Sequence, residues 1–533
     1  MEPCLDTGPR FEQYAGACEE KTLQEKPTGV HWDAHGEKAN RLPSSVVRST
    51  LALRYKHALC LHPYFRDSHS GSLGLAVFPP TGLEYVASAI EPHVGRVTVV
   101  DLRLRSPRRD LNALRKFISE EVDLLCISIN WEYHFREVCE LVNSLPGEVT
   151  TVVGGKQATD HVEEVFEACP GVDIIVRGEG EETIVEIAQG TDLEQIAGIS
   201  FRRGAGLVHN PHREFSDVDS FRFPNRDLRL MPYHINIGGM TFRAEEFDIV
   251  LTSRGCPYNC KFCTFNLNPW TQKRRFSARS IDSVMEELRQ ISAGIVLIAD
   301  ENFFVNPRRA KEICDRLVAE GIKKKFLVQA RIEVSDHPDV LESAARAGIK
   351  VFLFGIESPT DRILEQLNKG FDSARVRRAF ETFRKFPFYY HGYFIYGNLG
   401  ETEEEMMQIP VFSKELGLDS ITYQKLRVEK YSPLKDQVAA YPGYYVGDDT
   451  IVYSEHLGRQ GLKRISRQIR RKFYTPTQVW RAAAKLFRIG VLDSRDIPTL
   501  ALSAGVLLGQ SFSRSVNKAV KRPLLRYTAA TGK

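Results

Sequence analysis

Three cysteines lie within eight residues of the chain, at Cys256, Cys260 and Cys263. They follow an apolar, β-branched run at residues 249–252, a pattern typical of a buried strand. Thiolates are ligands for iron–sulfur clusters and for zinc. A structural zinc site needs a fourth ligand nearby, but no Cys or His occurs between Cys263 and Cys314, and Cys314 falls in a helical pattern. The spacing therefore favours a four-iron cluster with one open iron over an incomplete zinc knuckle or unligated core cysteines.

The cysteines are separated by three and then two residues, and Phe262 stands directly before the last of them. This pattern resembles the motif of the radical S-adenosylmethionine (SAM) superfamily. The resemblance implies that the open iron of a 4Fe–4S cluster chelates the amino and carboxylate groups of SAM, and that reductive cleavage yields a 5′-deoxyadenosyl radical. An electron donor such as flavodoxin or ferredoxin is then expected as a partner.

A regular alternation of strands and helices contains the cysteine motif, over residues 246–430. Apolar runs predict strands at 247–252, 295–299, 325–330, 350–355, 389–395 and about 420–426. Six such units resemble the partial (β/α)6 barrel of radical SAM enzymes. Chemistry in a barrel takes place at the carboxyl ends of the strands, which is where the cysteines lie.

Charged residues follow three of the later strands. Asp300 and Glu301 stand at the second strand end, where the superfamily's motif for the SAM amino group lies, but they depart from the usual Gly-Gly-Glu. Which of the two meets the amino group stays open. Arg331 at the third end could pair with the SAM carboxylate. Glu357 and Ser358 at the fourth end resemble, by position, a segment that holds the ribose or adenine. The alternative for Arg331 and Glu357 is a surface ion pair of little energetic value.

A second alternation precedes the cysteine motif, over residues 51–195. Its strands are continuous apolar runs, which indicates a parallel sheet covered by helices on both faces. Such sheets bind ligands at the carboxyl ends of their strands, and glycine there lets a planar ligand approach the backbone. Each such glycine alone is an ordinary turn residue, but together they resemble the cobalamin-binding domain of cobalamin-dependent radical SAM enzymes. The residues placed this way are Gly82, Gly154, Gly155, Gly178 and Glu179.

One departure from this resemblance concerns the lower axial ligand of cobalt. Many cobalamin-binding domains carry Asp-x-His-x-x-Gly, whose histidine binds the metal. Here Asp101 is followed by Leu102 and Arg103, so the resemblance implies cobalamin bound without that histidine. His62 and His134 could lie near the same sheet edge, although a lone histidine is more often a surface or hydrogen-bonded residue. A domain that has lost cobalamin stays open as an alternative.

The remaining segments flank or join the two domains. Residues 1–50 are polar without sustained periodicity, and residues 196–245 are rich in Arg, Pro and Gly, so we expect an N-terminal extension and an irregular linker. Residues 431–533 predict a basic helical region, with seventeen Lys and Arg against two Asp after residue 455. One helix there carries an apolar stripe suited to an anionic membrane surface, although a solvated helical face is an equal alternative. The stripe is Leu462, Ile465, Ile469 and Phe473.

The composition is that of a soluble globular chain of two or three domains, with 533 residues, 42% hydrophobic and 26% charged. No apolar run approaches the roughly 20 residues of a membrane span. The N-terminus shows no signal pattern, and ten cysteines with thiolate ligands indicate a reducing compartment. We therefore expect a cytoplasmic protein that could lie peripherally on the inner face of a membrane.

Together these features resemble the class B radical SAM methyltransferases. The expected fold class is α/β, with a doubly wound cobalamin-binding domain, a partial radical SAM barrel and a basic helical C-terminal region. The resemblance implies a cobalamin-dependent enzyme that methylates an unactivated carbon of a small hydrophobic substrate, as hopanoid and tetrapyrrole methylases do. The related anaerobic magnesium-protoporphyrin ester cyclase, an oxidative cyclase, is the alternative. No residue is assigned a catalytic role.

Two further functions fit less well. An RNA-modifying methylthiotransferase is suggested by the basic tail, but that family has a different N-terminal domain and binds a second cluster through further cysteines. Nucleic acid is therefore disfavoured as a partner. A non-enzymatic cobalamin sensor would not need the cysteine motif.

Overall fold

The computed structural model describes residues 53–64, 78–104, 110–131, 134–237, 240–263, 269–270 and 272–499. The chain divides into a unit Met1–Leu51 and a unit Ala52–Lys533, and the described residues belong to the second. The expected extension at 1–50 and the basic region beyond residue 499 lie outside the described residues.

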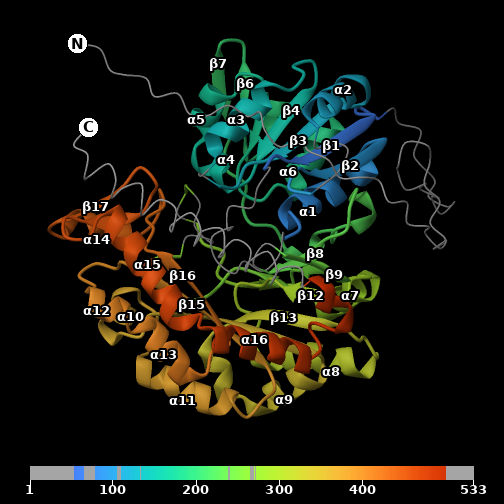
Figure 1. Ribbon diagram of the computed structural model, residues 1–533. Coiled ribbons are helices and arrows are strands. Elements are labelled where there is room, and N and C mark those ends of the chain that lie inside the picture. The colour runs from blue at the N-terminus through green and yellow to red at the C-terminus, as the bar shows by residue number, and fades with distance from the viewer. Residues whose placement is uncertain are drawn as a thin grey trace, which may run out of the picture. The chain divides into compact units, whose positions relative to one another are not determined.

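The first domain is built on a seven-stranded sheet with the strand order β2-β1-β3-β4-β5-β6-β7 (Figure 1). Strands β1 to β5 are parallel, and β6 and β7 add an antiparallel hairpin at one edge. Because β1 lies between β2 and β3, the strand order reverses there, and open α/β sheets bind ligands at such a switch point. The strands are β1 His57–His62, β2 Arg96–Asp101, β3 Leu124–Ser128, β4 Thr150–Gly154, β5 Ile174–Val176, β6 Ile199–Arg203 and β7 Gly206–His209.

Helices cover both faces of this sheet, as continuous apolar strands predict. Successive residues of β1 point into two separate cores, Leu59 and Leu61 into one and Ala58 and Cys60 into the other. The doubly wound fold is therefore confirmed. The first core is closed by α2 Leu111–Glu121, α3 Phe135–Asn143, α4 Lys156–Asp160 and α5 Val162–Ala168, and the second by α1 Thr81–Ile90 and α6 Glu181–Gln189.

The segment 196–245 differs from the irregular linker that its composition predicts. It contributes β6 and β7 to the first sheet, joined by a turn with Gly204 at φ +58°. It also contributes β8 (His234–Ile237) and the start of β9 (Met240–Val250) to the second sheet. The hairpin escaped detection because its strands are short and only the first three residues of β6 are buried, so neither strand forms a continuous apolar run.

The second domain is built on a seven-stranded sheet with the order β16-β15-β14-β13-β12-β9-β8. Six of its strands are parallel, and β8 pairs antiparallel with β9 at the edge. The six parallel strands are those predicted from the apolar runs. They are β9 together with β12 Ile295–Ile298, β13 Lys325–Ala330, β14 Ile349–Glu357, β15 Tyr389–Tyr396 and β16 Ser420–Lys425.

One face of this sheet, its outer face, is covered by a row of amphipathic helices (Figure 1). Alternate strand residues such as Val328, Phe352 and Phe354 point into this helical layer. Cys314 is buried within it on α8, as its helical pattern predicts. The helices between the strands are α7 Ile281–Gln290, α8 Pro307–Ala319, α9 Pro338–Arg346, α10 Asp361–Gln366, α11 Ser373–Phe383, α12 Glu403–Met406 and α13 Ile409–Leu416.

The C-terminal region is helical and basic, as predicted, but the apolar stripe of α15 (Arg459–Phe473) does not face outward. Its four stripe residues are fully buried in the outer core of the barrel, where α15 packs on α13. Helix α16 (Pro476–Arg488) covers the opposite, inner face of the sheet through Leu486 and Phe487. The other elements here are α14 Leu434–Ala440, β17 Tyr444–Val446 and β18 Val452–Ser454.

Across the described ranges up to residue 499, no helix is both long enough and apolar enough to cross a membrane.

Candidate cofactor sites

The three cysteines lie in a loop between two-residue strands, β10 (Ser253–Arg254) and β11 (Ser277–Ala278). We call residues 255–263 the cysteine loop. Its first residue, Gly255, has φ +87°, and a side chain there would clash with the carbonyl oxygen of Arg274. The three thiols are partly exposed and free of disulfides. In the described ranges no three His, Cys, Asp or Glu side chains gather closely around a single metal position. Three thiols on one loop are the donor set that a 4Fe–4S cluster with one open iron takes.

A second segment, residues 367–371, supports the cysteine loop from behind. The carbonyl oxygen of Leu367 accepts the amide of Lys261 at 3.0 Å, and the Asn368 side chain donates to the carbonyl oxygen of Asn259 at 2.8 Å. Asn368 itself has φ +53°. Sequence reasoning missed this support, although Asn-Lys-Gly after a helix is a turn signal. The loop is thus fixed by backbone hydrogen bonds that do not involve its thiols.

The Asp300 side chain holds the residues that lead into the cysteine loop. It is buried, and its two carboxylate oxygens accept hydrogen bonds from the amides and hydroxyls of Thr252 and Ser253 at 2.5–3.1 Å. Burial raises its pKa, while these four hydrogen bonds oppose the rise. The structure therefore gives Asp300 a positioning role and leaves it no free oxygen for a ligand.

Glu301 and Arg331 are better placed to meet an amino acid group. Glu301 accepts the amide of Gly255 through Oε2 at 3.2 Å, and burial raises its pKa. Arg331 is only 7% exposed, and it forms an ion pair with the partly exposed Glu333 at 2.7 Å, so the ion pair that the sequence left as an alternative is present but its arginine is buried. Its guanidinium lies 3.7 Å from the Cys260 sulfur and 3.7 Å from the Tyr258 ring centroid. One carboxylate and one guanidinium beside the thiols fit the amino and carboxylate groups of SAM.

The end of β14 is strained around Glu357. This residue has φ +71°, outside the region that non-glycine residues usually adopt, and such strain often marks a functional position. Its carboxylate forms a buried ion pair with Lys369 at 3.0 Å. A Cβ atom on Gly355 would stand 2.6 Å from the same carboxylate. Ser358 is buried and its hydroxyl accepts the amide of Thr360, so it shapes the turn.

The late tyrosines divide between the two faces of the sheet. Tyr390 and Tyr396 pack in the outer core, and Tyr423 donates to the carbonyl oxygen of Ser466 on α15. Tyr393 instead belongs to the inner face and is partly exposed. Burial, then the charge of Glu357, raises the pKa of Tyr393 to about 12. Tyr393 is thus the late-strand tyrosine that lies near the charged end of β14.

In the first domain, His62 marks the switch point at the carboxyl end of β1. Its ring is 2% exposed, neither ring nitrogen has a hydrogen-bond partner among the described residues, and the Tyr64 and Trp131 rings stand 5.0 and 5.6 Å away. Burial, then Arg103, lowers the pKa of His62 to about 3. His134, the other candidate, is exposed beside Glu137. A buried imidazole without partners at a switch point fits a site built for a ligand.

The glycines at this edge of the sheet differ in how strictly the backbone and its neighbours require glycine. A Cβ atom on Gly155, at φ +100°, would stand 2.6 Å from Asn130 Oδ1, so the loop after β4 requires glycine. Gly154 has looser neighbours at 3.8 Å or more, and nothing lies within 4 Å of a Cβ atom on Gly82. These two positions leave room beside the strand ends for a bulky planar ligand such as cobalamin. Gly178 has φ +83° and faces Trp270.

Arg103 occupies the place of the missing histidine and turns back on Asp101. Its guanidinium donates to both carboxylate oxygens of Asp101, which also accept the hydroxyl of Tyr233 at 2.9 Å. The pair is almost fully buried. Asp101, which would orient a histidine in the motif, is therefore bound by an arginine, as expected for a site without that ligand.

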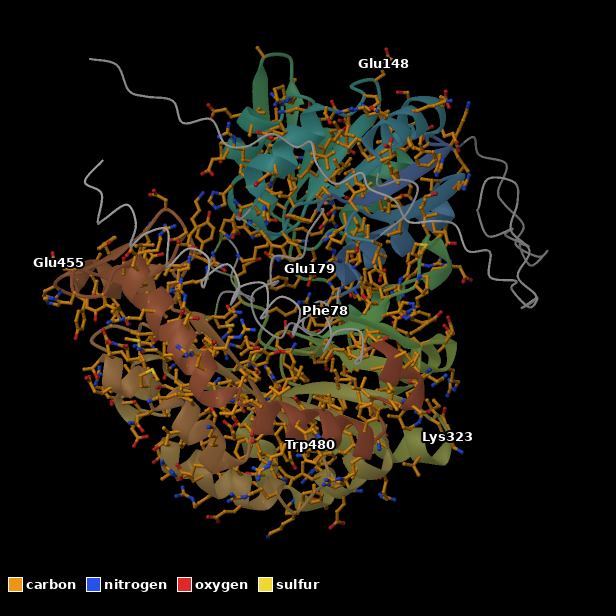
Figure 2. All side chains as sticks on the ribbon, in the orientation of Figure 1. Phe78, Glu148, Glu179, Lys323, Glu455 and Trp480 are labelled. Carbon is orange, nitrogen blue, oxygen red and sulfur yellow. The ribbon has the colours of Figure 1, made fainter. Side chains whose placement is uncertain are left out.

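Glu179 has partners other than a cofactor. It lies between the two domains in Figure 2, where its carboxylate pairs with Arg254 at 3.4 Å and Arg274 at 2.7 Å. Both arginines flank the cysteine loop. The sequence showed the Gly-rich turn after β5 but gave no sign of these distant partners.

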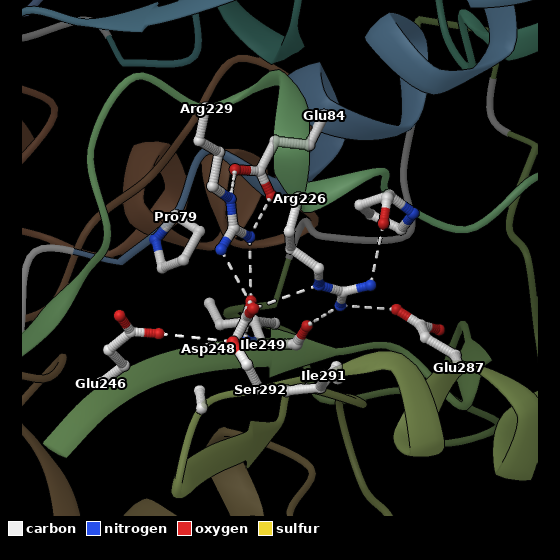
Figure 3. A network of polar contacts seen from close by, with 12 residues as sticks. Pro79, Glu84, Arg226, Arg229, Glu246, Asp248, Ile249, Glu287, Ile291 and Ser292 are labelled. Atoms are coloured by element: carbon white, nitrogen blue, oxygen red, sulfur yellow. Dashed lines mark hydrogen bonds and ion pairs between the residues drawn. The ribbon is translucent and has the colours of Figure 1, made fainter. Parts of the chain in front are cut away.

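A buried ionic network also joins the two domains (Figure 3). Arg229 pairs with Glu84 of α1 at 2.6 Å and with Asp248 of β9 at 2.9 Å. Arg226 pairs with Asp248 and with Glu287 of α7. The three carboxylates are at most 5% exposed, so the arginines between β7 and β8 hold buried charges that belong to both domains.

Comparison with known proteins supports both domains. A family model described as the radical SAM superfamily matches residues 250–410, and one described as the B12 binding domain matches residues 75–188. An uncharacterized methyltransferase of Pyrococcus horikoshii is 28% identical over 419 residues, 75% of this chain and 89% of that protein. The hopanoid C-3 methylase of Methylococcus capsulatus is 27% identical over 302 residues, 54% of this chain and 55% of that methylase.

Two further similarities concern the alternative function and the fold. The anaerobic magnesium-protoporphyrin IX monomethyl ester cyclase of Synechocystis is 26% identical over 321 residues, 58% of this chain and 62% of the cyclase. The radical SAM methyltransferase TsrM from Kitasatospora setae, whose structure holds cobalamin and a 4Fe–4S cluster, superposes with a TM-score of 0.57 at 18% identity. That match covers 83% of this chain and 92% of TsrM. At this identity the likeness shows a common fold.

Proposed function

We propose that this chain, which belongs to the radical SAM enzymes that carry a B12-binding domain, transfers a methyl group to an unactivated carbon of a small hydrophobic molecule. The observation that carries the proposal is the presence of two candidate cofactor sites in one chain, each at the carboxyl edge of a parallel sheet. One is the cysteine loop with Glu301 and Arg331 beside it, and the other is the switch point with the buried His62. Methyl transfer from SAM to oxygen or nitrogen would need neither edge.

The hard chemistry belongs to the cofactors, since the cluster and SAM together supply a carbon radical and cobalamin carries the methyl group. The chain's own residues hold and orient these groups. Cys256, Cys260 and Cys263 provide the thiolates. Glu301 binds the amino group of SAM and Arg331 its carboxylate, while Asp300 fixes the entrance of the loop.

Glu357 and Ser358 keep their expected place at the ribose or adenine side of SAM. The Glu357–Lys369 pair is buried and rigid, so it presents a fixed polar wall. Gly82, Gly154, Gly155 and Gly178 remain the residues proposed to border cobalamin. The Glu179 carboxylate is already paired with Arg254 and Arg274, so we do not expect it to bind cobalamin directly.

The proposed substrate is lipid-like or a tetrapyrrole. The inner face of the barrel supports this class, because Tyr393 is partly exposed there near Glu357. Ile395, two residues along the same strand, is also partly exposed. The hopanoid C-3 methylase and the magnesium-protoporphyrin cyclase among the relatives favour the same class. Tyr393 is the residue we expect to contact the substrate.

Two partners complete the proposal. An acidic carrier such as flavodoxin or ferredoxin supplies electrons. An anionic membrane meets the outer face of α15 and the start of α16, where Arg467, Arg470 and Arg471 are exposed and none of them has a carboxylate partner within the described ranges. Trp480 is 71% exposed on α16 (Figure 2).

The test is the balance of products. A deletion strain compared with its parent by metabolite mass identifies the substrate, and the purified enzyme is then assayed on it. Methylation should consume two SAM per product, giving one S-adenosylhomocysteine, one 5′-deoxyadenosine and a mass gain of one methylene. If 5′-deoxyadenosine forms without S-adenosylhomocysteine and the mass does not rise by a methylene, the oxidative cyclase is the correct function.

A further inference from the structure

The turn between β5 and α6, residues 177–181, is built against the cysteine loop. It belongs to the B12-binding domain, yet its acidic side chains point to arginines of the other domain. Glu181 and Glu179 both pair with Arg254, which stands two residues before Cys256. Glu179 also pairs with Arg274 at 2.7 Å. We call these four residues the Glu–Arg bridge.

The Arg254 guanidinium contacts two aromatic rings as well as the two carboxylates. It lies 4.9 Å from the Tyr85 ring of α1 and 4.7 Å from the Phe221 ring. The Arg254 side chain is 18% exposed and that of Glu181 only 7% exposed. A guanidinium between two aromatic faces and two carboxylates has one preferred position. The backbone of Arg254, and with it the start of the cysteine loop, is therefore tied to the first domain.

Arg274, which lies shortly before β11, makes the second contact with this turn. It pairs with Glu179, its guanidinium also donates to the carbonyl oxygen of Ser216 at 2.8 Å, and its backbone packs directly on Gly255. Trp270 adds an apolar contact, because its ring meets Gly178 and lies 5.6 Å from the Arg177 guanidinium. Arg254 and Arg274 thus both tie the start of the cysteine loop, at Gly255, to the same short turn.

The same turn follows β5, whose carboxyl end borders the proposed cobalamin edge. The amide of Gly178 donates to Thr159 of α4 at 3.0 Å, and α4 follows the Gly155 loop. A ligand that settles against the loops after β4 and β5 must therefore change or fix the position of Glu179 and Glu181. The four residues of the bridge lie outside the apolar cores of the two sheets.

We propose that Glu179 and Glu181 are positioning residues that transmit occupation of the B12-binding domain to the cysteine loop through Arg254 and Arg274. The inference rests on the proposed function, since it takes both cofactors as given, and it adds a coupling between them. The Gly-rich turn therefore contacts both the cobalamin edge and the cysteine loop. Cobalamin bound in the first domain reduces the mobility of the cysteine loop and so changes the environment of the cluster.

The experiment compares the full chain with the double variant Glu179→Gln/Glu181→Gln. Glu182→Gln is the matched control, because Glu182 follows Glu181 in the same helix but is 45% exposed and pairs with Arg213 instead of Arg254. Each protein is reconstituted anaerobically with iron and sulfide, and iron and hydroxocobalamin binding are measured first. Two readouts follow, with and without hydroxocobalamin. They are hydrogen exchange of residues 253–263 and the electron paramagnetic resonance spectrum of the reduced cluster with SAM.

In the wild type and in Glu182→Gln, hydroxocobalamin should slow exchange of residues 253–263 by on the order of tenfold and shift the cluster spectrum. In the double variant both responses should be lost while iron content and hydroxocobalamin binding persist. The single Glu181→Gln variant should lose most of the response if the double variant proves unstable. Responses in the variants equal to those of the wild type would overturn the coupling alone. A wild type that binds iron and hydroxocobalamin without either response would also overturn it, and one that binds neither would overturn the proposed function as well.

Discussion

Replacing Glu301 by Gln and, separately, Asp300 by Ala or Asn tests two roles that the sequence could not separate. Gln keeps the shape of Glu301 and its hydrogen bond to the Gly255 amide, but it removes the charge that would meet the SAM ammonium group. A hydrogen bond to a charged partner contributes about 1.5–3 kcal/mol. SAM should therefore bind Glu301→Gln roughly one to two orders of magnitude more weakly, with the iron content unchanged.

Asp300 should behave in the opposite way. Asp300→Ala leaves the buried amides of Thr252 and Ser253 without acceptors, and each buried unsatisfied donor costs about 1–3 kcal/mol. The entrance of the cysteine loop should loosen, and iron retention should fall. Asp300→Asn should be much milder, because its amide oxygen still accepts the two backbone amides and the hydroxyls of Thr252 and Ser253 can turn to accept from its NH₂ group.

The assay is equilibrium binding of SAM to anaerobically reconstituted protein, with iron and sulfide counted on the same samples. Iron content separates loss of the cluster from loss of the SAM contact. The reasoning fails if Glu301→Gln binds SAM like the wild type while Asp300→Asn, with its iron intact, does not. In that case the first acidic residue would meet the amino group and the hydrogen bonds of Asp300 would be rearranged in the bound state.

Other outcomes follow from the same structure. The triple Cys→Ala variant of Cys256, Cys260 and Cys263 should lose cluster absorbance and SAM cleavage, and one zinc per chain without iron in anaerobically purified protein would contradict the cluster. Arg229→Met should lower the free energy of unfolding by about 3–5 kcal/mol, because it leaves Glu84 buried and unpaired, whereas the more exposed Arg213→Met should cost under about 1 kcal/mol; equal losses in a denaturant titration would refute this. Burial lowers the pKa of His62 to about 3 from 6.5, so the folded state binds fewer protons than the unfolded state, and wild-type stability should fall, relative to His62→Phe, as pH drops from 6.5 toward 3. The cob(II)alamin form should show no imidazole nitrogen splitting; a splitting that His62→Ala abolishes would make His62 the axial ligand. Acidic vesicles should float the protein in a salt-sensitive way, each nearby cation contributing about 1 kcal/mol, and equal recovery with neutral lipid, or preferential RNA binding, would remove the membrane proposal.

The sequence was sufficient for features that depend on local pattern. The cysteine spacing, the six barrel strands and the doubly wound sheet all follow from short motifs and apolar runs, and the structure confirms both folds. The support behind the cysteine loop could not be predicted in this way. Leu367 and Asn368 contact the loop from more than 100 residues away. Leu367 uses its backbone carbonyl and Asn368 its side-chain amide, and both bind backbone groups of the loop, which the residue types of the loop do not reveal.

Charged residues after strands were harder to assign for a related reason. Asp300, Glu301, Glu179 and Glu357 all follow strand ends, where both ligands and structural partners occur. In the structure these residues differ in the hydrogen bonds and ion pairs that each carboxylate already forms. Asp300 and Glu179 are engaged by loop amides and hydroxyls or by arginines, while Glu301 accepts a longer hydrogen bond, from the Gly255 amide at 3.2 Å. The sequence placed the right residue types at the right edge but could not say which were already occupied.

The α15 helix shows why an amphipathic pattern does not by itself indicate a membrane surface. A stripe of Leu, Ile and Phe has the same spacing whether it meets lipid or a neighbouring helix. Here α13 offers a complementary apolar face through Ile409, Phe412 and Leu416, and the stripe is buried there. Once the stripe is satisfied, the basic residues must occupy the outer side of the helix. Within the described part of the C-terminal region, a membrane contact would therefore rest on those cations and on exposed apolar side chains such as Trp480, and it should be more sensitive to salt than the insertion of an apolar helix face would be.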